Sequence, residues 1–228
     1  MNLKDKVIVI TGGTKGLGRA FAEGFIAEGS RVIICSTNKE EVQAVASEIG
    51  VLGVCADVTI ENDMTRLADE AIGNYGEIDV WVNNAGVWIP HMNTEDFDMN
   101  KVRRMFDINI LGTIHGSRVA LRTMKEKKQG VLLNVISDSA LVGRPMSSAY
   151  SASKWAVNGF TKSIREENPD VTVLAIFPGA FQSSIFGDVE PAKFSDFMLA
   201  DYVVNKTITN LKLENPEEDL IIQKPIKN

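Results

Sequence analysis

Short apolar runs alternate with amphipathic helical segments along this chain, and this alternation limits its possible folds more than any other feature. The first run, residues 7–10 (Val-Ile-Val-Ile), is apolar at every position, as expected of a strand that is covered on both faces. Further short, mainly apolar runs follow at 31–35, 51–56, 78–82, 131–136 and 171–177, and the segment 219–225 is expected to form a last strand at the edge of the sheet. Strands separated by helices indicate an α/β fold, with a doubly wound parallel sheet of about seven strands and helices on both faces.

Length and charge narrow the class of protein. The 228 residues, 44% of them hydrophobic, suit a single domain over residues 1–228 with a full core. The net charge of −6 and the lack of a basic stripe argue against a nucleic-acid partner. No apolar run approaches the roughly 18 residues of a membrane span, and the first residues lack a signal-peptide pattern, so we expect a cytoplasmic protein without a membrane segment. Cys35 and Cys55 lack the spacing of a metal site, so we expect no metal.

A glycine-rich turn follows the first strand. Gly12, Gly16 and Gly18 allow a tight turn, close approach of the backbone to a phosphate, and close packing of the next helix on the sheet. The N-terminus of that helix then offers free amide groups to a pyrophosphate. Because the turn lies between a predicted strand and a predicted helix, it indicates a Rossmann-like dinucleotide site. The same site is expected to include Thr14, Lys15 and Leu17.

The end of the second strand bears on the choice of nucleotide. In this fold an acidic side chain there favours a free ribose 2′-hydroxyl, whereas basic or neutral polar side chains tolerate a 2′-phosphate. Ser36, Thr37 and Asn38 include no acid, and Lys15 is placed to pair with a phosphate. The sequence therefore favours NADP(H) over NAD(H).

Two further strands end in residues that suit a cofactor, because ligands of open α/β sheets bind at the carboxyl ends of the strands. Asp57 and Val58 follow the third strand, where Asp57 is placed to accept a hydrogen bond from the adenine amino group. Asn84, Ala85 and Gly86 follow the fourth strand, and their small side chains let a ribose lie against the backbone.

Tyr150 and Lys154 form the strongest candidate for chemistry. They lie four residues apart in a segment that is predicted to be helical to about residue 167, so they share one face of the helix. A phenol titrates near ~10, and a fixed cation beside it stabilises the phenolate. We therefore expect Lys154 to lower the pKa of Tyr150 and allow proton exchange at neutral pH.

Taken together, these motifs resemble the short-chain dehydrogenase/reductase family. The glycine turn at 11–18, the Asn-Asn-Ala-Gly sequence at 83–86, the Tyr150 and Lys154 pair and Pro178-Gly179 occur in the order of that family, over about residues 5–223. The chain is similar to its single-domain members, such as β-ketoacyl-acyl carrier protein reductase and small hydroxy-acid dehydrogenases. The resemblance implies an NADP(H)-dependent oxidoreductase that acts on a small-molecule carbonyl or secondary alcohol.

The resemblance also implies four catalytic residues, Asn109, Ser137, Tyr150 and Lys154. Ser137 and Tyr150 would hydrogen-bond the substrate carbonyl, with Tyr150 as general acid or base. Lys154 would bind the nicotinamide ribose, and Asn109 would position a water that connects Lys154 to solvent. Ser139 is the rival of Ser137, which is preferred because it leaves the strand directly. Further cofactor contacts are expected from Pro178, Gly179 and Phe181.

The substrate side is expected to be a modest, largely apolar pocket under a short lid at about residues 184–197. Ser137 should meet the substrate there. The apolar candidates are Trp88, Leu141, Val142, Met146, Phe181 and Phe186, of which Trp88, Met146 and Phe186 are assigned as substrate contacts. His91 and Asp138 are polar exceptions.

Several alternatives stay open at this stage. Members of the family usually form dimers or tetramers through helices near residues 100–125 and 148–167, so we expect a homodimer or homotetramer. A non-catalytic NADP-binding sensor or scaffold is the competing function. Among enzymes, the substrate can be a β-ketoacyl thioester, a small hydroxy acid, or a hydroxysteroid or xenobiotic carbonyl. An acidic carrier would call for a basic patch, for which the candidates are Arg103, Arg104, Arg118 and Arg122.

Overall fold

The central sheet of the protein is entirely parallel. The computed structural model describes residues 1–186, 191 and 193–225, and within them seven strands form one sheet in the order β3-β2-β1-β4-β5-β6-β7. This arrangement confirms the doubly wound fold predicted from the alternation of apolar runs and helices. The strands are β1 (Val7–Thr11), β2 (Arg31–Ser36), β3 (Leu52–Cys55), β4 (Val80–Asn83), β5 (Val131–Val135), β6 (Thr172–Pro178) and β7 (Asp219–Ile222).

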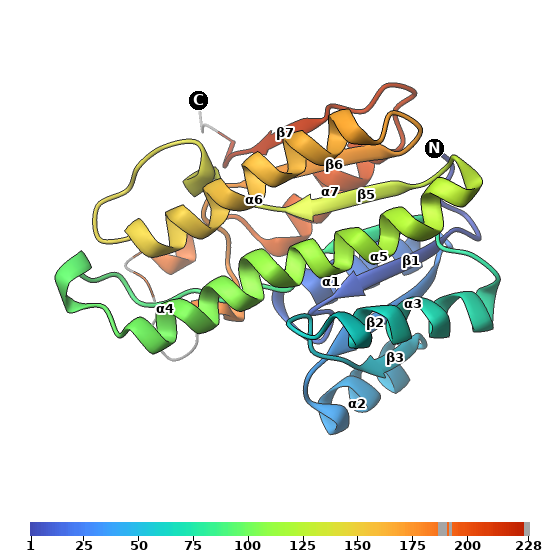
Figure 1. The fold of residues 1–228 in the computed structure, drawn as a ribbon, viewed down its shortest axis with the longest axis horizontal. Coiled ribbons are helices and arrows are strands. Elements are labelled where there is room, and N and C mark those ends of the chain that lie inside the picture. The colour runs from blue at the N-terminus through green and yellow to red at the C-terminus, as the bar shows by residue number, and fades with distance from the viewer. Residues whose placement is uncertain (187–190, 192, 226–228) are drawn as a thin grey trace.

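Helices cover both faces of the sheet (Figure 1). Buried residues of α1, α2 and α7 join one core cluster, and those of α3, α5 and α6 join the cluster on the opposite face. The helices are α1 (Gly16–Ala27), α2 (Lys39–Ile49), α3 (Glu61–Tyr75), α4 (Met99–Phe106), α5 (Gly112–Lys127), α6 (Ser148–Glu167) and α7 (Ala200–Leu211).

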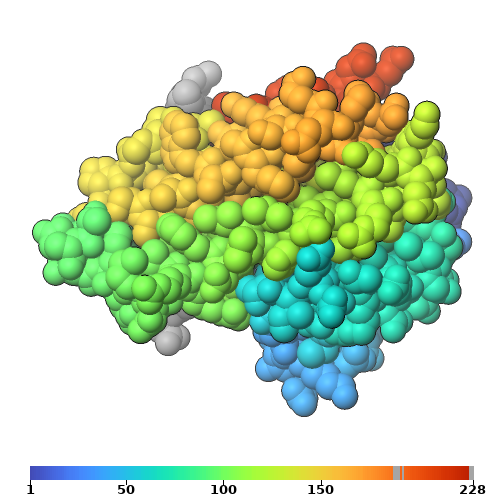
Figure 2. Space-filling view, viewed as in Figure 1, coloured from blue at the N-terminus to red at the C-terminus, as the bar shows by residue number. Residues whose placement is uncertain are grey.

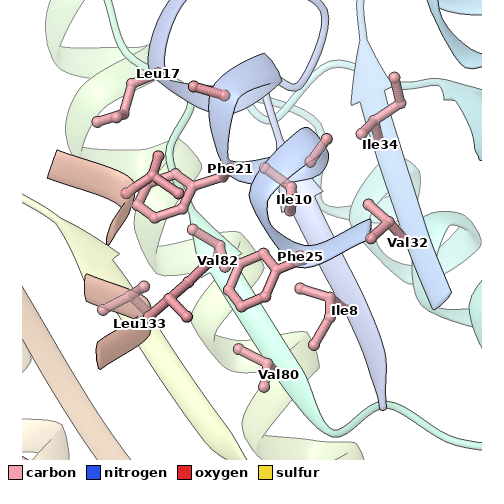
Figure 3. Packing of buried hydrophobic residues seen from close by; sticks show 14 of the residues in the cluster. Ile8, Ile10, Leu17, Phe21, Phe25, Val32, Ile34, Val80, Val82 and Leu133 are labelled. Atoms are coloured by element: carbon pink, nitrogen blue, oxygen red, sulfur yellow. The ribbon is translucent and has the colours of Figure 1, made fainter. Parts of the chain in front are cut away.

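The core follows from the two-residue period of the strands, because successive side chains point to opposite faces. Ile8 and Ile10 of β1 face α1, where they pack with Phe21 and Phe25, whose ring centroids lie 6.0 Å apart (Figure 3). Val9, between them, belongs to the cluster under α3 and α5. Both sides of β1 are therefore buried, which is the reason that its sequence is apolar at every position.

A π-helical turn joins α4 to α5. The chain is helical from Met99 to Lys127, but Asp107–Leu111 forms a π turn rather than part of a regular α-helix. Such turns inside helices are frequent at functional sites. Asn109 lies in this turn, and its carbonyl accepts a hydrogen bond from the Thr113 hydroxyl at 2.8 Å.

The segment predicted to be a lid contains two short 3-10 turns, Ser184–Phe186 and Phe194–Asp196. Residues 187–190 and 192 of that segment lie outside the described residues. Among the helices that the structure describes, none combines the length and the apolar character that crossing a membrane requires. The cytoplasmic location stays a prediction.

Candidate active site

A cavity of about 520 Å³ lies at the carboxyl ends of the strands. The loops after β1 to β6 line it, together with the first turns of α1 and α6. The arrowheads of β1 and β5 in Figure 1 point toward this end of the sheet. The cavity therefore brings together segments that are far apart in the sequence, as the parallel strand order requires.

The glycine turn forms one part of the cavity wall. Gly12 and Gly16 have positive φ angles of 64° and 54°, which glycine adopts without strain. A Cβ atom at Gly18 would lie 2.1 Å from the Gly12 carbonyl oxygen and 2.5 Å from Nδ2 of Asn84, so α1 packs on the turn only because residue 18 is glycine. The first amide groups of a helix lack intrahelical acceptors. The first residues of α1 belong to this wall, so their amide groups are available there. The wall contains Gly12, Thr14, Lys15, Gly16, Leu17 and Gly18.

The end of β2 has a different arrangement from the one predicted. Ser36 and Thr37 line the cavity, but the side chain of Asn38 is the N-cap of α2, where its Oδ1 accepts a hydrogen bond from the Glu41 amide at 2.9 Å. Asn38 is not among the described residues that line the cavity, whereas Glu41 is. Glu41 was not predicted from the sequence as a cavity residue. The Asn-x-x-Glu pattern of a helix N-terminus places residues 38 and 41 side by side, so this signal was present in the sequence.

Asp57 and Val58 also line the cavity. One Asp57 carboxylate oxygen accepts hydrogen bonds from the amide and the hydroxyl of Thr59, at 2.8 and 2.7 Å, and the other lies 3.3 Å from Arg104. Burial raises the pKa of the Asp57 carboxyl, but these hydrogen bonds outweigh burial and hold that pKa below its ordinary value. Asp57 is therefore an ionised acceptor at neutral pH.

Ser137, Tyr150 and Lys154 come together at the other part of the cavity, and all three line it. Ser137 lies two residues after the end of β5, and the two α6 residues lie one turn apart, so the helix period places them on the same face. The Lys154 ammonium lies 5.8 Å from the centre of the Tyr150 ring and donates a hydrogen bond to the Val135 carbonyl at 3.2 Å. Ser139, the rival of Ser137, also lines the cavity and donates its amide to Ser137 Oγ at 3.1 Å.

The pKa values of this cluster correct one prediction. Burial raises the pKa of Tyr150 to about 12, the hydrogen bond to Ser137 lowers it, and the nearby Asp138 carboxylate raises it. Burial also lowers the pKa of Lys154 from 10.5 to about 8. The expected net lowering of the tyrosine pKa is therefore wrong for this structure, because loss of hydration is the largest influence on the pKa of both groups. Tyr150 is a protonated phenol at neutral pH.

Asn109 lies behind the cavity wall and holds it in place. Its Oδ1 accepts from the Val87 amide at 2.8 Å, and its Nδ2 donates to the Val87 carbonyl at 2.9 Å and to Ser153 Oγ at 3.1 Å. Ser153 in turn donates to the Tyr150 carbonyl at 2.7 Å. One amide side chain thus connects the loop after β4 to the helix that carries Tyr150.

The substrate side contains some of the predicted apolar residues and one that the sequence analysis missed. Trp88, Phe181 and Phe186 line the cavity, as do the two polar exceptions. Leu141, Val142 and Met146 are exposed and are not among the described residues that line it. The missed residue is Arg144, which lines the cavity and forms an ion pair with Asp138 at 2.5 Å. Asp138 and Arg144 are six positions apart in a loop, and this spacing does not by itself predict an ion pair, so the pair becomes evident only in the folded structure.

Comparison with known proteins places this site in a family. The family model described as short chain dehydrogenase matches residues 6–193. The chain belongs to the short-chain dehydrogenase/reductase family of oxidoreductases. Family relatives include an uncharacterised oxidoreductase of Bacillus subtilis (strain 168), 32% identical over 236 residues; the match covers 96% of this chain and 66% of that relative, just under two thirds of its length. An uncharacterised oxidoreductase of Staphylococcus aureus (strain USA300) is 34% identical over 194 residues, covering 83% and 84% of the two chains.

Solved structures of similar short-chain dehydrogenases share the whole fold. An alcohol dehydrogenase from Thermococcus sibiricus, complexed with 5-hydroxy-NADP, matches with a TM-score of 0.85 and 25% identity, over 97% of this chain and 99% of that one. A 3-ketoacyl-(acyl-carrier-protein) reductase from Brucella melitensis, complexed with NADH, matches with a TM-score of 0.89 and 27% identity, over 96% and 97%.

The cavity of this short-chain dehydrogenase fits a dinucleotide. The positive φ angles of Gly12 and Gly16 and the lack of a side chain at Gly18 let the backbone at the start of α1 approach a ligand closely, as a pyrophosphate requires. The other predicted cofactor positions line the same cavity, namely Asn84, Ala85, Gly86, Pro178, Gly179 and Phe181. Among the residues that the structure describes, no group of histidine, cysteine and acidic side chains is arranged to hold a metal ion.

Proposed function

We propose that this protein is an NADP(H)-dependent oxidoreductase that interconverts a carbonyl and a secondary alcohol, with Tyr150 as general acid and base. The observation that carries the proposal is one continuous cavity that contains the glycine cradle, Ser137, Tyr150 and Lys154. A phosphate-binding turn and a proton donor in one cavity suit redox chemistry on a small carbonyl substrate.

The side chains divide the work. A bound nicotinamide supplies the hydride that this chemistry requires. Tyr150, held protonated by burial, donates a hydrogen bond and then its proton to the carbonyl oxygen, and Ser137 shares that oxygen. Lys154, with a pKa of about 8, carries most of its charge at neutral pH and stabilises the phenolate that remains. Asn109 keeps the loop after β4 in register with α6; its positioning of a water for Lys154 stays a prediction.

NADP(H) is proposed over NAD(H) because the charge at the end of β2 fits a 2′-phosphate. Lys15, Ser36 and Thr37 line that part of the cavity, and no acid stands at 35–38. The carboxylate of Glu41 lines it as well and weakens the preference by repelling a phosphate. One of the two solved relatives is complexed with 5-hydroxy-NADP and the other with NADH, so the affinities of this protein for NADPH and for NADH have to be measured directly.

The homodimer or homotetramer is also a proposal, and the outer surface of α5 and α6 supports it. The two helices lie beside one another over one face of the sheet and form a broad surface (Figures 1 and 2). Leu111, at the end of the π turn, and Trp155 of α6 are 45% and 50% exposed, which is high for large apolar side chains on such a surface. Size-exclusion chromatography with light scattering tests the proposal, and a monomer at micromolar concentration would refute it.

The deciding experiment measures cofactor binding and turnover in the same samples. Purified protein is titrated with NADPH and NADH by nucleotide fluorescence and then assayed with ketones, keto acids and keto thioesters. We expect tighter NADPH binding and turnover of at least one class. Tyr150→Phe should bind NADPH normally and lose roughly 10²- to 10⁴-fold in turnover. Normal binding without turnover in the wild type would instead favour the non-catalytic sensor or scaffold.

A further inference from the structure

We infer that the substrate is an uncharged ketone or secondary alcohol with a bulky apolar group, preferably a ring, and that free carboxylates and carrier-bound thioesters are poor substrates. This inference rests on the proposed function and names the substrate class of the same site. Two features carry it: an aromatic cluster in the cavity wall and the pairing of the arginine beside Ser137 with an acidic side chain.

The aromatic cluster consists of Trp88, Phe186, Phe194 and Phe197. Phe186 lies at its centre, with ring centroids 5.2 Å from Trp88, 6.0 Å from Phe194 and 6.1 Å from Phe197. The Trp88 contact is edge-to-face at 77°, and so is the Phe194 contact at 89°. Such pairs hold their geometry while leaving ring faces and edges free to contact a ligand.

The cluster combines two distant segments of the chain. Trp88 follows β4, and the three phenylalanines belong to the segment that precedes α7. Trp88, Phe186 and Phe197 line the cavity, which also contains Ser137 and Tyr150. A substrate carbonyl bound at Ser137 and Tyr150 therefore has an aromatic wall available to its substituent. An apolar substituent gains there from burial, and a ring gains further from contact with the aromatic faces.

The arginine beside the catalytic residues is already paired with an acidic side chain. Arg144 lies close to Ser137, because it forms an ion pair at 2.5 Å with Asp138, the next residue after Ser137. Asp138 also accepts a hydrogen bond from Gln223 at 3.4 Å. The Lys154 ammonium is buried and donates to the Val135 carbonyl. A substrate carboxylate would enter a wall of aromatic carbon and an existing ion pair, and an anion that is buried without a partner costs binding energy.

Half of the basic patch that an acidic carrier protein requires is already paired with acidic side chains. Arg104 pairs with Asp57 at 3.3 Å and Arg118 with Glu61 at 3.4 Å, so two of the four candidate arginines already have acidic partners. The net charge of −6 adds long-range repulsion toward an acidic partner. These contacts favour a free small molecule over a carrier-bound thioester.

The test compares matched ketones with the wild-type enzyme. Acetophenone and para-acetylbenzoate share one ring and one carbonyl and differ by a carboxylate. Methyl hexyl ketone, acetone and the N-acetylcysteamine thioester of acetoacetate complete the set. We expect kcat/KM to be at least tenfold higher for acetophenone than for para-acetylbenzoate, because of the carboxylate. It should also be at least tenfold higher than for the thioester, which lacks a ring, with acetone weak.

Two variants test the two features separately. Trp88→Leu should lower kcat/KM about tenfold more for acetophenone than for acetone. Tyr75→Leu is the matched control, because it removes a ring that contacts Arg31 at the start of β2, at the opposite end of the sheet. Asp138→Asn should free Arg144 and raise the ratio of para-acetylbenzoate to acetophenone about tenfold. Thermal unfolding of each variant verifies that it is folded.

The outcomes separate the two proposals. Turnover that favours para-acetylbenzoate or the thioester in the wild type would overturn the substrate class and leave the proposed function standing. An equal effect of Trp88→Leu on acetone and acetophenone would show that the aromatic cluster does not determine the preference for a ring. Failure of every ketone with both nucleotides would overturn the proposed function, and the substrate class with it.

Discussion

Replacing Lys154 with methionine should stabilise the fold while removing catalysis. Lys154 is only 6% exposed, and burial lowers its pKa from 10.5 to about 8. Each pKa unit corresponds to about 1.4 kcal/mol, so keeping this charge buried at pH 7 costs about 3 kcal/mol. Methionine has similar length and no charge, but it gives up the hydrogen bond from the charged ammonium to the Val135 carbonyl, worth about 2 kcal/mol. The expected net gain in unfolding free energy is about 1 kcal/mol at pH 7.

The pH dependence of this gain is a sharper test than its size. Below pH 8 the lysine is protonated in both the folded and the unfolded state, so the full cost of burial is present. Between about 8 and 10.5 the folded state loses the proton while the unfolded state keeps it, so wild-type stability rises with pH relative to the variant. The advantage of Lys154→Met should therefore disappear as pH approaches 10.

Urea unfolding of the cofactor-free protein, at pH 7 and near pH 10, measures both quantities. Lys162→Met is the matched control, because Lys162 is exposed on the same helix and its replacement should change stability by less than about 0.5 kcal/mol at either pH. Destabilisation by Lys154→Met at pH 7, or an advantage that persists unchanged near pH 10, would refute the argument from burial. A stabilised but inactive variant would show that the site is maintained at a cost to the fold.

Three further predictions concern the cofactor side and the loop after β4. Gly18→Ala should abolish nucleotide binding in a fluorescence titration and lower the melting temperature, because its Cβ would lie 2.1 Å from the Gly12 carbonyl; unchanged binding would contradict this. Lys15→Gln should weaken NADPH binding about fivefold and leave NADH binding unaffected. Glu41→Gln should instead strengthen NADPH binding. Equal effects of a variant on both nucleotides would exclude a contact with the 2′-phosphate. Asn109→Ala should lose about 1–3 kcal/mol of unfolding free energy, because it leaves the Val87 backbone groups unpaired, and should reduce kcat more than nucleotide affinity; a change confined to stability would give Asn109 a structural role alone.

The sheet and the glycine turn could be predicted because their causes are local. A strand buried on both faces must be apolar at every position, and the sequence 7–10 shows this directly. The positive φ angles at Gly12 and Gly16 are nearly specific to glycine, so the residue type itself reports the backbone. The same is true of Tyr150 and Lys154, because the period of a helix determines that residues four apart share a face.

The remaining features depend on contacts between distant segments, which no local pattern encodes. The pKa of Tyr150 reflects how completely the surrounding loops exclude water, and this burial reverses the effect expected from a nearby lysine. Trp88 and Phe186 meet only when the loop after β4 and the segment before α7 lie at the same end of the sheet. Arg144 pairs with Asp138 because the loop between them folds back and brings the two side chains together. Local backbone preferences thus account for the scaffold, while the electrostatics and the shape of the pocket arise from which side chains the folded chain brings together and shields from water.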